Sequence, residues 1–295
     1  MAVARPTIAF VGLGAMGLPM ARRLAAAGFR VRGHDMDPGR GAALAAAGGE
    51  CPGSLARTVR GADVLLLMVV DAAQVADILF AQEAVAQLAP DAVVVLMATC
   101  PPRAVAALAE RVEALGRAFV DAPVSGGVVG AEGGGLTIMA AASPDVLAAV
   151  RPVLDALGDR VFHVGTRAGQ GATVKAVNQL LCGVHIAAAA EALALAGSVG
   201  VELPVVLEIL SGSSASSWML RDRGRRMLEA DPRVTSAVDI FVKDLAIVVE
   251  AGRDARAALP LAALAHQLFL STSGRGDGRA DDSQVIRAYR ALNGR

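Results

Sequence analysis

Lys175 is the residue of this chain whose position most suggests chemistry. It lies in Gly169-Gln-Gly-Ala-Thr-Val-Lys-Ala-Val-Asn-Gln179, a largely apolar segment with helical character. A buried lysine loses the hydration of its charge, so it needs a partner or a function. If burial or a nearby cation lowers its pKa far below about 10.4, the neutral amine can act as a general base. The alternative is a lysine that extends its ammonium to the surface.

Two amides, Asn178 and Gln179, follow the lysine by three and four residues. This spacing places them on the same face of a helix as Lys175. There they can hold a substrate hydroxyl or carboxylate and orient the lysine without adding charge. The alternative is a packing role in which the amides form a hydrogen bond to another helix.

A glycine-rich loop near the start of the chain indicates the reaction in which such a lysine takes part. The sequence Gly12-Leu13-Gly14-Ala15-Met16-Gly17 follows an apolar run ending at Val11 and opens a helical segment. The first glycine makes a tight turn, the second admits a pyrophosphate and the third lets the helix pack on the strand. The helix N-terminus supplies N–H groups for the phosphates. We therefore predict dinucleotide binding by these six residues and proton transfer beside a hydride transfer; the alternative is a glycine-rich turn in another α/β fold.

Asp35 follows the second apolar run, 18 residues after Gly17. A carboxylate at this place accepts hydrogen bonds from the adenosine ribose and repels a 2′-phosphate. Met36, not an arginine, comes next, so the sequence favours NAD over NADP. Asp37 is one possible alternative acceptor, although before Pro38 it is equally suited to cap a helix.

The order of apolar runs and helical segments predicts the fold. Strands are expected at residues 7–11, 29–34, 63–68, 92–96, 119–123, 136–140 and 161–164, and their Val/Leu-rich character predicts a parallel sheet covered on both faces. Helices alone are expected afterwards, at 170–199, 204–212, 217–229, 235–253, 259–271 and 281–292. We expect an α/β fold: a Rossmann-type, doubly wound sheet in residues 1–167, then an all-α domain in residues 168–295 that begins with a long interdomain helix.

Composition narrows the class of protein. Hydrophobic residues make up 54% of the 295 residues and charged residues 19%, which excludes a disordered chain. The formal net charge of zero gives no support to nucleic-acid binding. Three scattered cysteines, Cys51, Cys100 and Cys182, fit a reducing, cytoplasmic setting and form no metal motif.

The alanine-rich stretch from Gly183 to Val199 is apolar on all sides. It contains His185 and Glu191, with Lys175 just upstream, so we interpret it as a buried helix and expect no membrane partner. A helix that is apolar all round is normally covered all round. We therefore expect a homodimer or homotetramer.

Four segments resemble the β-hydroxyacid dehydrogenases, the family related to 3-hydroxyisobutyrate dehydrogenase. They are Phe10-Val-Gly-Leu-Gly-Ala-Met-Gly17; Asp121-Ala-Pro-Val-Ser-Gly-Gly127 with Gly130-Ala-Glu-Gly-Gly134; Gly171-Ala-Thr-Val-Lys-Ala-Val-Asn-Gln179; and Lys243-Asp-Leu245. The resemblance covers nearly the whole chain, and the order and spacing of the segments make it specific.

The resemblance implies roles for the substrate-binding and catalytic residues. Lys175 would be the catalytic acid/base. Ser125, Gly126 and Gly127 would bind the carboxylate end of the substrate through a hydroxyl and backbone N–H groups. Asn178 and Gln179 would assist, although the family often has asparagine where this chain has Gln179.

It also implies cofactor contacts beyond the glycine loop. Thr99 would lie on the nicotinamide ribose side, and Val69 and Val70 would contact the cofactor after another strand. The usual residue at Val70 is proline, so that loop departs from the family pattern. Lys243 would reach the cofactor or active site, with an ion pair to Asp239 or Asp244 as the alternative.

The implied activity is NAD-dependent oxidation of a small hydroxy acid or sugar acid. Oxidation of 3-hydroxyisobutyrate and reduction of tartronate semialdehyde are alternatives within the family, and a dinucleotide-binding protein without catalysis is a remote one. The residues show no metal constellation. Trp218 could line the substrate cleft or belong to the core, and His185 and His266 are expected to be core histidines.

Overall fold

The computed structural model describes residues 5–294. The chain divides after Lys175 into two compact units. This division falls inside the longest helix, α9 (Gln170–Ser198), a few residues beyond the 167/168 boundary expected from the sequence. Each unit is described below by itself.

The first unit is built on an eight-stranded sheet. Its strands are β1 (Thr7–Val11), β2 (Arg30–His34), β3 (Val64–Leu67), β4 (Val93–Leu96), β5 (Ala118–Asp121), β6 (Val124–Ser125), β7 (Thr137–Ala141) and β8 (Arg160–Gly165). They lie in the order β2-β1-β3-β4-β5-β7-β6, with β8 also paired to β7. The order reverses at β1, so the carboxyl ends of β1 and β3 form the switch point where doubly wound sheets bind ligands.

The sheet is mainly parallel, as expected, but it contains antiparallel pairs at one edge. Strands β1 to β5 are parallel, whereas β7 runs antiparallel to β5 and β6. The two-residue strand β6 was not predicted. The turn from β5 through β6 and the short helix α7 (Gly127–Gly133) reverses the chain without a full crossover helix, so β7 returns in the opposite direction.

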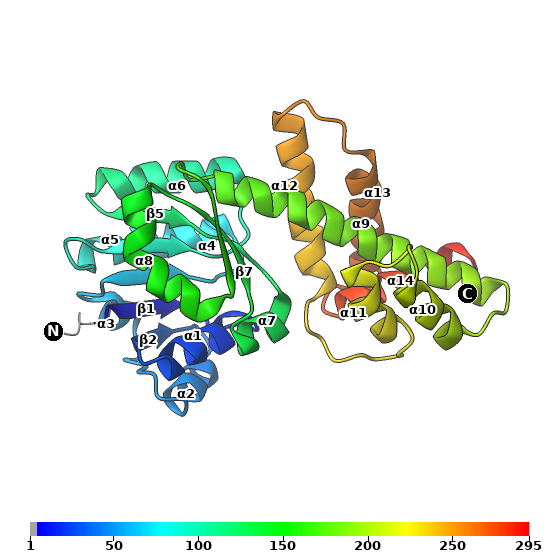
Figure 1. Cartoon of the computed structure of the whole chain (residues 1–295), viewed down its shortest axis with the longest axis horizontal. Coiled ribbons are helices and arrows are strands. Elements are labelled where there is room, and N and C mark those ends of the chain that lie inside the picture. The colour runs from blue at the N-terminus through cyan, green and yellow to red at the C-terminus, as the bar shows by residue number, and fades with distance from the viewer. Residues whose placement is uncertain (1–4, 295) are drawn as a thin grey trace. The chain divides into compact units, whose positions relative to one another are not determined.

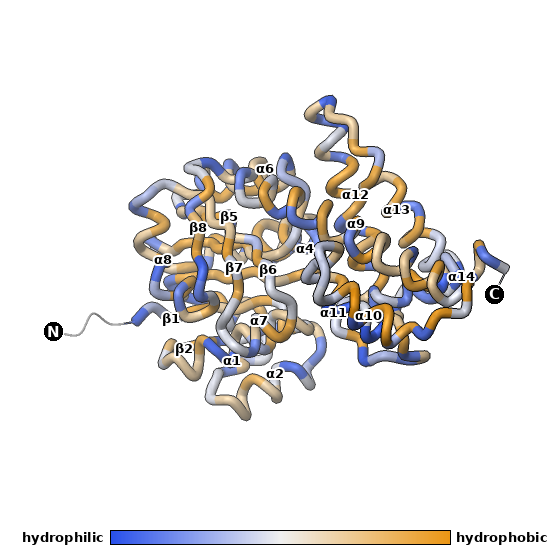
Figure 2. Tube along the Cα trace, turned by 45° about the vertical axis from the view of Figure 1, so that its right-hand side comes forward, coloured by the Kyte–Doolittle hydropathy of each residue, from blue (hydrophilic) through white to orange (hydrophobic). Residues whose placement is uncertain are grey.

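Side chains alternate between the two faces of the sheet, so a hydrophobic core lies on each face. Ile8 and Phe10 point into one core, and Ala9 and Val11 point into the other, all nearly inaccessible to solvent. Figure 1 shows α1 and α2 on one side of the strands and α5 and α6 on the other. In Figure 2 the strands form the hydrophobic interior of this unit.

The helices of the first unit follow the strands in sequence. Besides α7, they are α1 (Gly17–Ala26), α2 (Pro38–Ala45), α3 (Leu55–Val59), α4 (Ala72–Ala76) with the π-helical turn η1 (Asp77–Ala81), α5 (Ala84–Gln87), α6 (Pro102–Ala114) and α8 (Pro144–Leu157). Polar residues cap several of them: Ser54 accepts the N–H of Arg57 at the start of α3, and Asp71 accepts that of Gln74 at the start of α4.

The second unit is all helical, as expected. It contains the rest of α9, then α10 (Leu203–Gly212), α11 (Trp218–Met227), α12 (Val238–Asp254), α13 (Pro260–Thr272), the turns η2 (Ser273–Asp277) and η3 (Asp282–Val285), and α14 (Ile286–Leu292). Stacked rings of Phe241 and Phe269, 5.1 Å apart, lie in its core. Arg223 forms a two-pronged ion pair with buried Asp282, both bonds at 2.9 Å.

Helix α9 is long and apolar enough to cross a membrane by length and composition alone. In this chain 44% of its most apolar stretch is buried. Large apolar side chains on it nevertheless remain exposed, among them Val177, Leu181 and Leu195. The helix is therefore only partly covered by its own chain.

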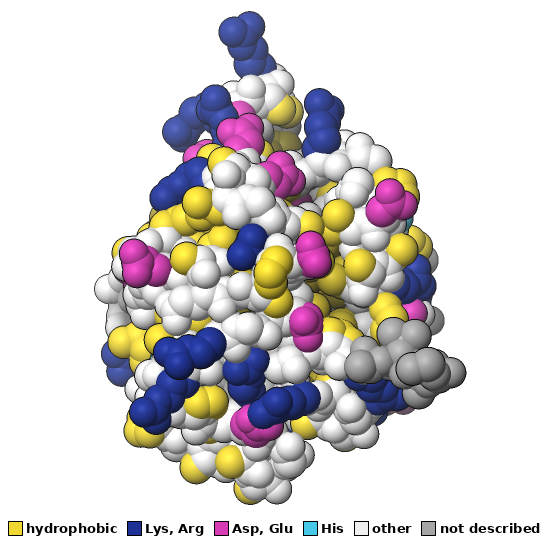
Figure 3. All heavy atoms as spheres, turned by 90° about the vertical axis from the view of Figure 1, so that its left-hand side faces the viewer, with side chains coloured by type: hydrophobic (Ala, Val, Ile, Leu, Met, Phe, Trp, Pro, Cys, Tyr) yellow, Lys and Arg dark blue, Asp and Glu magenta, His cyan; other side chains and the backbone are white. Residues whose placement is uncertain are grey.

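The face of the molecule in Figure 3 carries Lys and Arg side chains interspersed with Asp and Glu, and scattered hydrophobic groups between them. Charges of both signs on one face produce no extended field of one sign there.

Candidate active site

The glycine loop turns sharply where the chain leaves β1. Gly12 has φ = +92°, and its N–H donates to the carbonyl oxygen of His34 at 3.0 Å. A Cβ at Gly12 would overlap the carbonyl oxygen of Met68, so only glycine fits. A Cβ at Gly17 would overlap the carbonyl oxygen of Gly12, which explains how α1 approaches the strand closely.

Helix α1 presents an uncapped N-terminus beside this loop. Met16, at the cap position, makes no side-chain hydrogen bond, and the first turn contains no acidic residue. Backbone N–H groups at such an end carry partial positive charge and suit a phosphate. The loop and helix therefore fit the pyrophosphate of a dinucleotide.

Asp35 ties the loop to the end of β2. Its Oδ2 accepts the N–H of Leu13 at 2.7 Å, and its Oδ1 accepts the N–H of Asp37 at 2.9 Å. Only 11% of the Asp35 side chain is exposed. Asp37 accepts the N–H of Gly39 and caps α2, which confirms the alternative interpretation of that residue.

Arg40 is a charged neighbour that the sequence reasoning missed. Its guanidinium lies 3.5 Å from the Asp35 carboxylate and 3.4 Å from that of Asp37, and about half of its side chain is exposed. In the sequence, the position directly after Asp35 holds Met36 and no arginine. The signal lay one helical turn later, because α2 brings residue 40 back toward the strand end.

The loops after β3 and β4 lie at the same edge of the sheet. Val69 packs near Gly12, since a Cβ at that glycine would lie 3.0 Å from Val69 Cγ1. Val70 is 51% exposed, and its N–H donates to the Gln74 side chain at 3.0 Å. Thr99 follows β4 and is partly buried. The structure thus brings Val69 to the glycine loop. Val70, the next residue, is half exposed and is bonded to Gln74.

Ser125, Gly126 and Gly127 form the turn from β6 into α7. Ser125 pairs with Thr137 of β7 and is partly exposed. Gly126 and Gly127 both have positive φ, at +134° and +62°, so a plain turn explains the glycines as well as a ligand-binding loop does. Their N–H groups and the serine hydroxyl remain suited to a carboxylate.

Lys175 is buried in the second turn of α9, with 7% of its surface exposed. The interpretation as a lysine extending into solvent is therefore wrong. The first turn of the same helix contacts Asp121, the last residue of β5. The carboxylate of Asp121 accepts the N–H groups of Gly169 and Ala172 at 2.8 and 2.9 Å. Burial raises the pKa of Asp121 to about 6, against the opposing effect of these amides.

In the second unit, four side chains form a continuous polar row. Asn178 Nδ2 donates to Gln179 Oε1 at 2.9 Å, and Gln179 Nε2 donates to Asp244 Oδ2 at 2.5 Å. Lys243 Nζ lies 2.7 Å from Asp244 Oδ1. The row joins α9 to α12, and Gln179 and Asp244 are 7% and 3% exposed.

This row confirms two alternatives from the sequence. Gln179 does form a hydrogen bond between helices, and Lys243 does pair with Asp244. Neither contact prevents a role in ligand binding, because Asn178 and Lys243 are only partly buried. Asp244 was expected only as an alternative ion-pair partner of Lys243, and its hydrogen bond from Gln179 was missed. Its position beside Lys243 in the family segment was the available signal.

The remaining candidates lie outside both groups. Trp218 is half exposed, with the Arg223 guanidinium 5.9 Å from its ring, so it is not a core residue. Burial lowers the pKa of His266, whose Nε2 has no hydrogen-bond partner within residues 5–294. His185 is partly buried.

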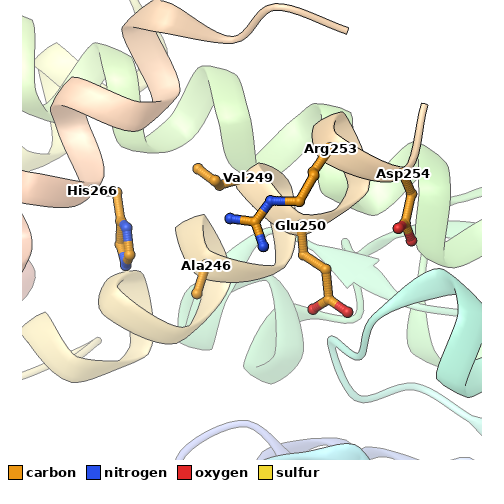
Figure 4. Close-up of a pocket in the computed structure, with 6 residues that line it drawn as sticks. All are labelled: Ala246, Val249, Glu250, Arg253, Asp254 and His266. Carbon is orange, nitrogen blue, oxygen red and sulfur yellow. The ribbon is translucent and has the colours of Figure 1, made fainter. Parts of the chain in front are cut away.

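A cavity of about 400 Å³ in the second unit contains none of the candidate residues except His266. Its lining comes from α12 and α13: Ala246, Val249, Glu250, Arg253, Asp254 and His266 (Figure 4). Its charges are mixed in sign, and it adds no group to the chemistry above. Within residues 5–294 no group of three His, Cys, Asp or Glu side chains is arranged to hold a metal ion.

Comparison with known proteins agrees with this geometry. Residues 7–165 match the family model described as the NAD binding domain of 6-phosphogluconate dehydrogenase. Residues 169–289 match the model described as NAD-binding of NADP-dependent 3-hydroxyisobutyrate dehydrogenase. L-threonate dehydrogenase of Cupriavidus necator is 41% identical, over 96% of this chain and 95% of that protein. L-threonate dehydrogenase of Escherichia coli is 39% identical, over 97% and 95%.

Among solved structures, 3-hydroxyisobutyrate dehydrogenase from Salmonella typhimurium has a TM-score of 0.90 and 39% identity, covering 95% of this chain and 99% of that one. The sheet, its glycine loop and the helical unit after it define a nicotinamide dinucleotide-dependent dehydrogenase acting on a CH–OH group. The chain belongs to the β-hydroxyacid dehydrogenase family, the family related to 3-hydroxyisobutyrate dehydrogenase. This confirms the resemblance found in the sequence.

Proposed function

We propose that this chain oxidises L-threonate to 2-dehydro-L-erythronate with NAD as the hydride acceptor and Lys175 as the acid/base. The observation that carries the proposal is the burial of Lys175 on α9, inside the segment shared with the family. The two similar L-threonate dehydrogenases support the substrate. Further support comes from the stretch Ser236–Leu245 and from Asp281-Asp-Ser283, which resemble that branch of the family.

Lys175 accounts for the proton in this reaction. The substrate C–H bond breaks with its electron pair, the O–H bond loses its proton, and a C=O bond forms. When bound, the nicotinamide accepts the hydride. The neutral Lys175 amine takes the hydroxyl proton and becomes an ammonium, which later releases the proton to solvent. This step requires the neutral form of the amine.

The substrate carboxylate is held by the Ser125 hydroxyl and the N–H groups of Gly126 and Gly127. Asn178 hydrogen-bonds a substrate hydroxyl through its amide, and Gln179 fixes the orientation of Asn178 through the 2.9 Å bond between them. Lys243 contacts the cofactor.

The remaining cofactor contacts come from the loop Gly12, Leu13, Gly14, Ala15, Met16 and Gly17, with Val69, Val70 and Thr99. The Asp35 carboxylate accepts hydrogen bonds from the adenosine ribose hydroxyls. It favours NAD over NADP because it repels the 2′-phosphate of NADP. Arg40 balances part of that charge, so we expect the discrimination against NADP to be incomplete.

A substrate screen tests the reaction. NADH absorbance would be followed with L-threonate, D-threonate, L-erythronate, D-glycerate and 3-hydroxyisobutyrate, and the reverse reaction with tartronate semialdehyde. The proposal expects the highest kcat/KM for L-threonate with NAD. Strong turnover of 3-hydroxyisobutyrate or glycerate and none of L-threonate would reject the substrate, and turnover of tartronate semialdehyde alone would assign the reductase instead.

Two substitutions of Lys175 test the acid/base. Lys175→Ala removes the amine. Lys175→Arg supplies a guanidinium, which stays protonated near neutral pH and so cannot accept a proton. Both should bind NADH with nearly unchanged affinity and lose turnover by about 10²-fold or more. Retained turnover in Lys175→Arg would contradict a proton-accepting role.

The proposal includes self-association in the cytoplasm, through the exposed apolar side chains of α9. Val174, Val177 and Leu181 recur at helical spacing and are all exposed, which is unusual on a monomer. Light scattering after size exclusion should give a dimer or tetramer, with no detergent needed to keep the protein in the supernatant. A monomer at micromolar concentration, or a requirement for detergent, would reject this part.

A further inference from the structure

The first turn of α9 obtains its cap from a distant strand. Gly169, which precedes the helix, has no side chain that could accept the first N–H groups. The Asp121 carboxylate, at the end of β5, accepts the N–H of Gly169 at 2.8 Å and that of Ala172 at 2.9 Å. Asp121 therefore does for α9 what a capping side chain does for other helices.

The carboxylate is almost completely buried, with 1% of the residue exposed. A buried carboxylate without hydrogen bonds is strongly unfavourable, so its two amide partners explain why it is tolerated. An asparagine could accept the same two bonds without burying a charge.

Close packing restricts the same turn. A Cβ at Gly171 would lie 2.5 Å from the carbonyl oxygen of Met139 on β7 and 2.7 Å from that of Asp121. The turn therefore rests directly against the ends of β5 and β7. Thr173 closes it with a 2.7 Å bond from its hydroxyl to the Gly169 carbonyl.

Lys175 follows Ala172 by three residues on this helix. Its backbone therefore lies about 4.5 Å further along the helix axis than that of Ala172. A helix transmits the position of its first turn to its second, because its backbone hydrogen bonds leave little freedom between them. We infer that Asp121 is a positioning residue: by holding the first turn of α9 against β5 it sets where the Lys175 amine lies. This inference rests on the proposed function of Lys175.

The test compares three substitutions. Asp121→Ala leaves two buried N–H groups without an acceptor, so the first turn should loosen and kcat should fall about 10- to 100-fold, since small misplacements of a catalytic group have effects of this size. Asp121→Asn keeps an acceptor oxygen and should recover kcat to within about threefold. Ser54→Ala removes the cap of α3 in the same unit and should leave kcat unchanged.

Two readouts separate positioning from general damage. The dissociation constant for NADH should change less than about threefold in Asp121→Ala, because the glycine loop is not altered. Hydrogen exchange of the peptide covering residues 166–176 should accelerate in Asp121→Ala and not in Ser54→Ala. This second readout does not depend on turnover.

An Asp121→Ala protein that unfolds cooperatively and keeps its kcat would overturn the inference, as would a loss of activity that Asp121→Asn does not recover. If Asp121→Ala does not fold, Gly171→Ala displaces the same turn while both hydrogen-bonding partners remain, and a folded Gly171→Ala with unchanged kcat would also overturn it. Failure of the proposed function is a different result: Lys175→Ala would keep its turnover, whatever the Asp121 variants do.

Discussion

Asp121 should make the stability of the chain depend on pH in an unusual direction. Burial raises its pKa from 3.8 to about 6, so the folded protein binds a proton on this group more readily than the unfolded chain does. Above about pH 6 both states are ionised and the full penalty of the buried charge is present. As pH falls through 6 toward 3.8, protonation removes that penalty, and this group's contribution to stability improves.

The magnitude follows from the shift. A difference of roughly two pKa units corresponds to about 3 kcal/mol at complete protonation, of which about 1.4 kcal/mol is already gained at about pH 5. Asp121→Asn cannot titrate, so the wild type should gain this amount relative to the variant between about pH 7.5 and pH 5. Using the difference cancels the contributions of other titrating groups that the two proteins share.

Urea unfolding followed by circular dichroism is the suitable assay. Tryptophan fluorescence would report only on the second unit, because Trp218 is the single tryptophan. A free-energy difference between wild type and Asp121→Asn that stays constant over this pH range would refute the reasoning. It would mean that the carboxylate is ionised equally well in the folded and unfolded states.

Three further changes probe the remaining groups. Gly12→Ala places a Cβ against the Met68 carbonyl oxygen at a backbone position with positive φ. It should weaken NADH binding at least about tenfold in a fluorescence titration. Unchanged affinity would exclude the loop as the pyrophosphate site. Asp244→Ala leaves Gln179 and Lys243 without their buried acceptor and should lower the free energy of unfolding by about 3 kcal/mol; a loss near zero would show that the polar row contributes nothing. Arg40→Ala should lower kcat/KM with NADP about tenfold and leave that with NAD within about twofold, and an equal effect on both cofactors would separate Arg40 from their discrimination.

Local pattern was sufficient for most of the first unit. The glycine loop, the strand before it and the carboxylate after the second strand are all encoded within a few residues, and each was found at its expected place. The helical second unit was predicted with boundaries close to those of the structure, since proline and glycine mark the helix ends. The roles assigned to the site residues remain predictions.

What the sequence did not reveal depends on contacts between distant residues. Asp121 meets the amides of α9 across 48 residues, and Gln179 meets Asp244 across 65, so no local spacing signals either bond. The direction of β7 was missed because strand periodicity is the same in either orientation. The two-residue strand β6 is too short to show any periodicity.

The cap that β5 provides for α9 has a consequence for recombining this chain with its relatives. One possible junction for exchanging helical units between family members is the start of α9, which begins at Gln170 and so lies a few residues before the division after Lys175. A junction there separates Asp121 from the amides of Gly169 and Ala172, which then come from different parents. Because the donors are backbone N–H groups, either parent can supply them, so such chimeras should work when the parent of the sheet provides an acceptor side chain at position 121.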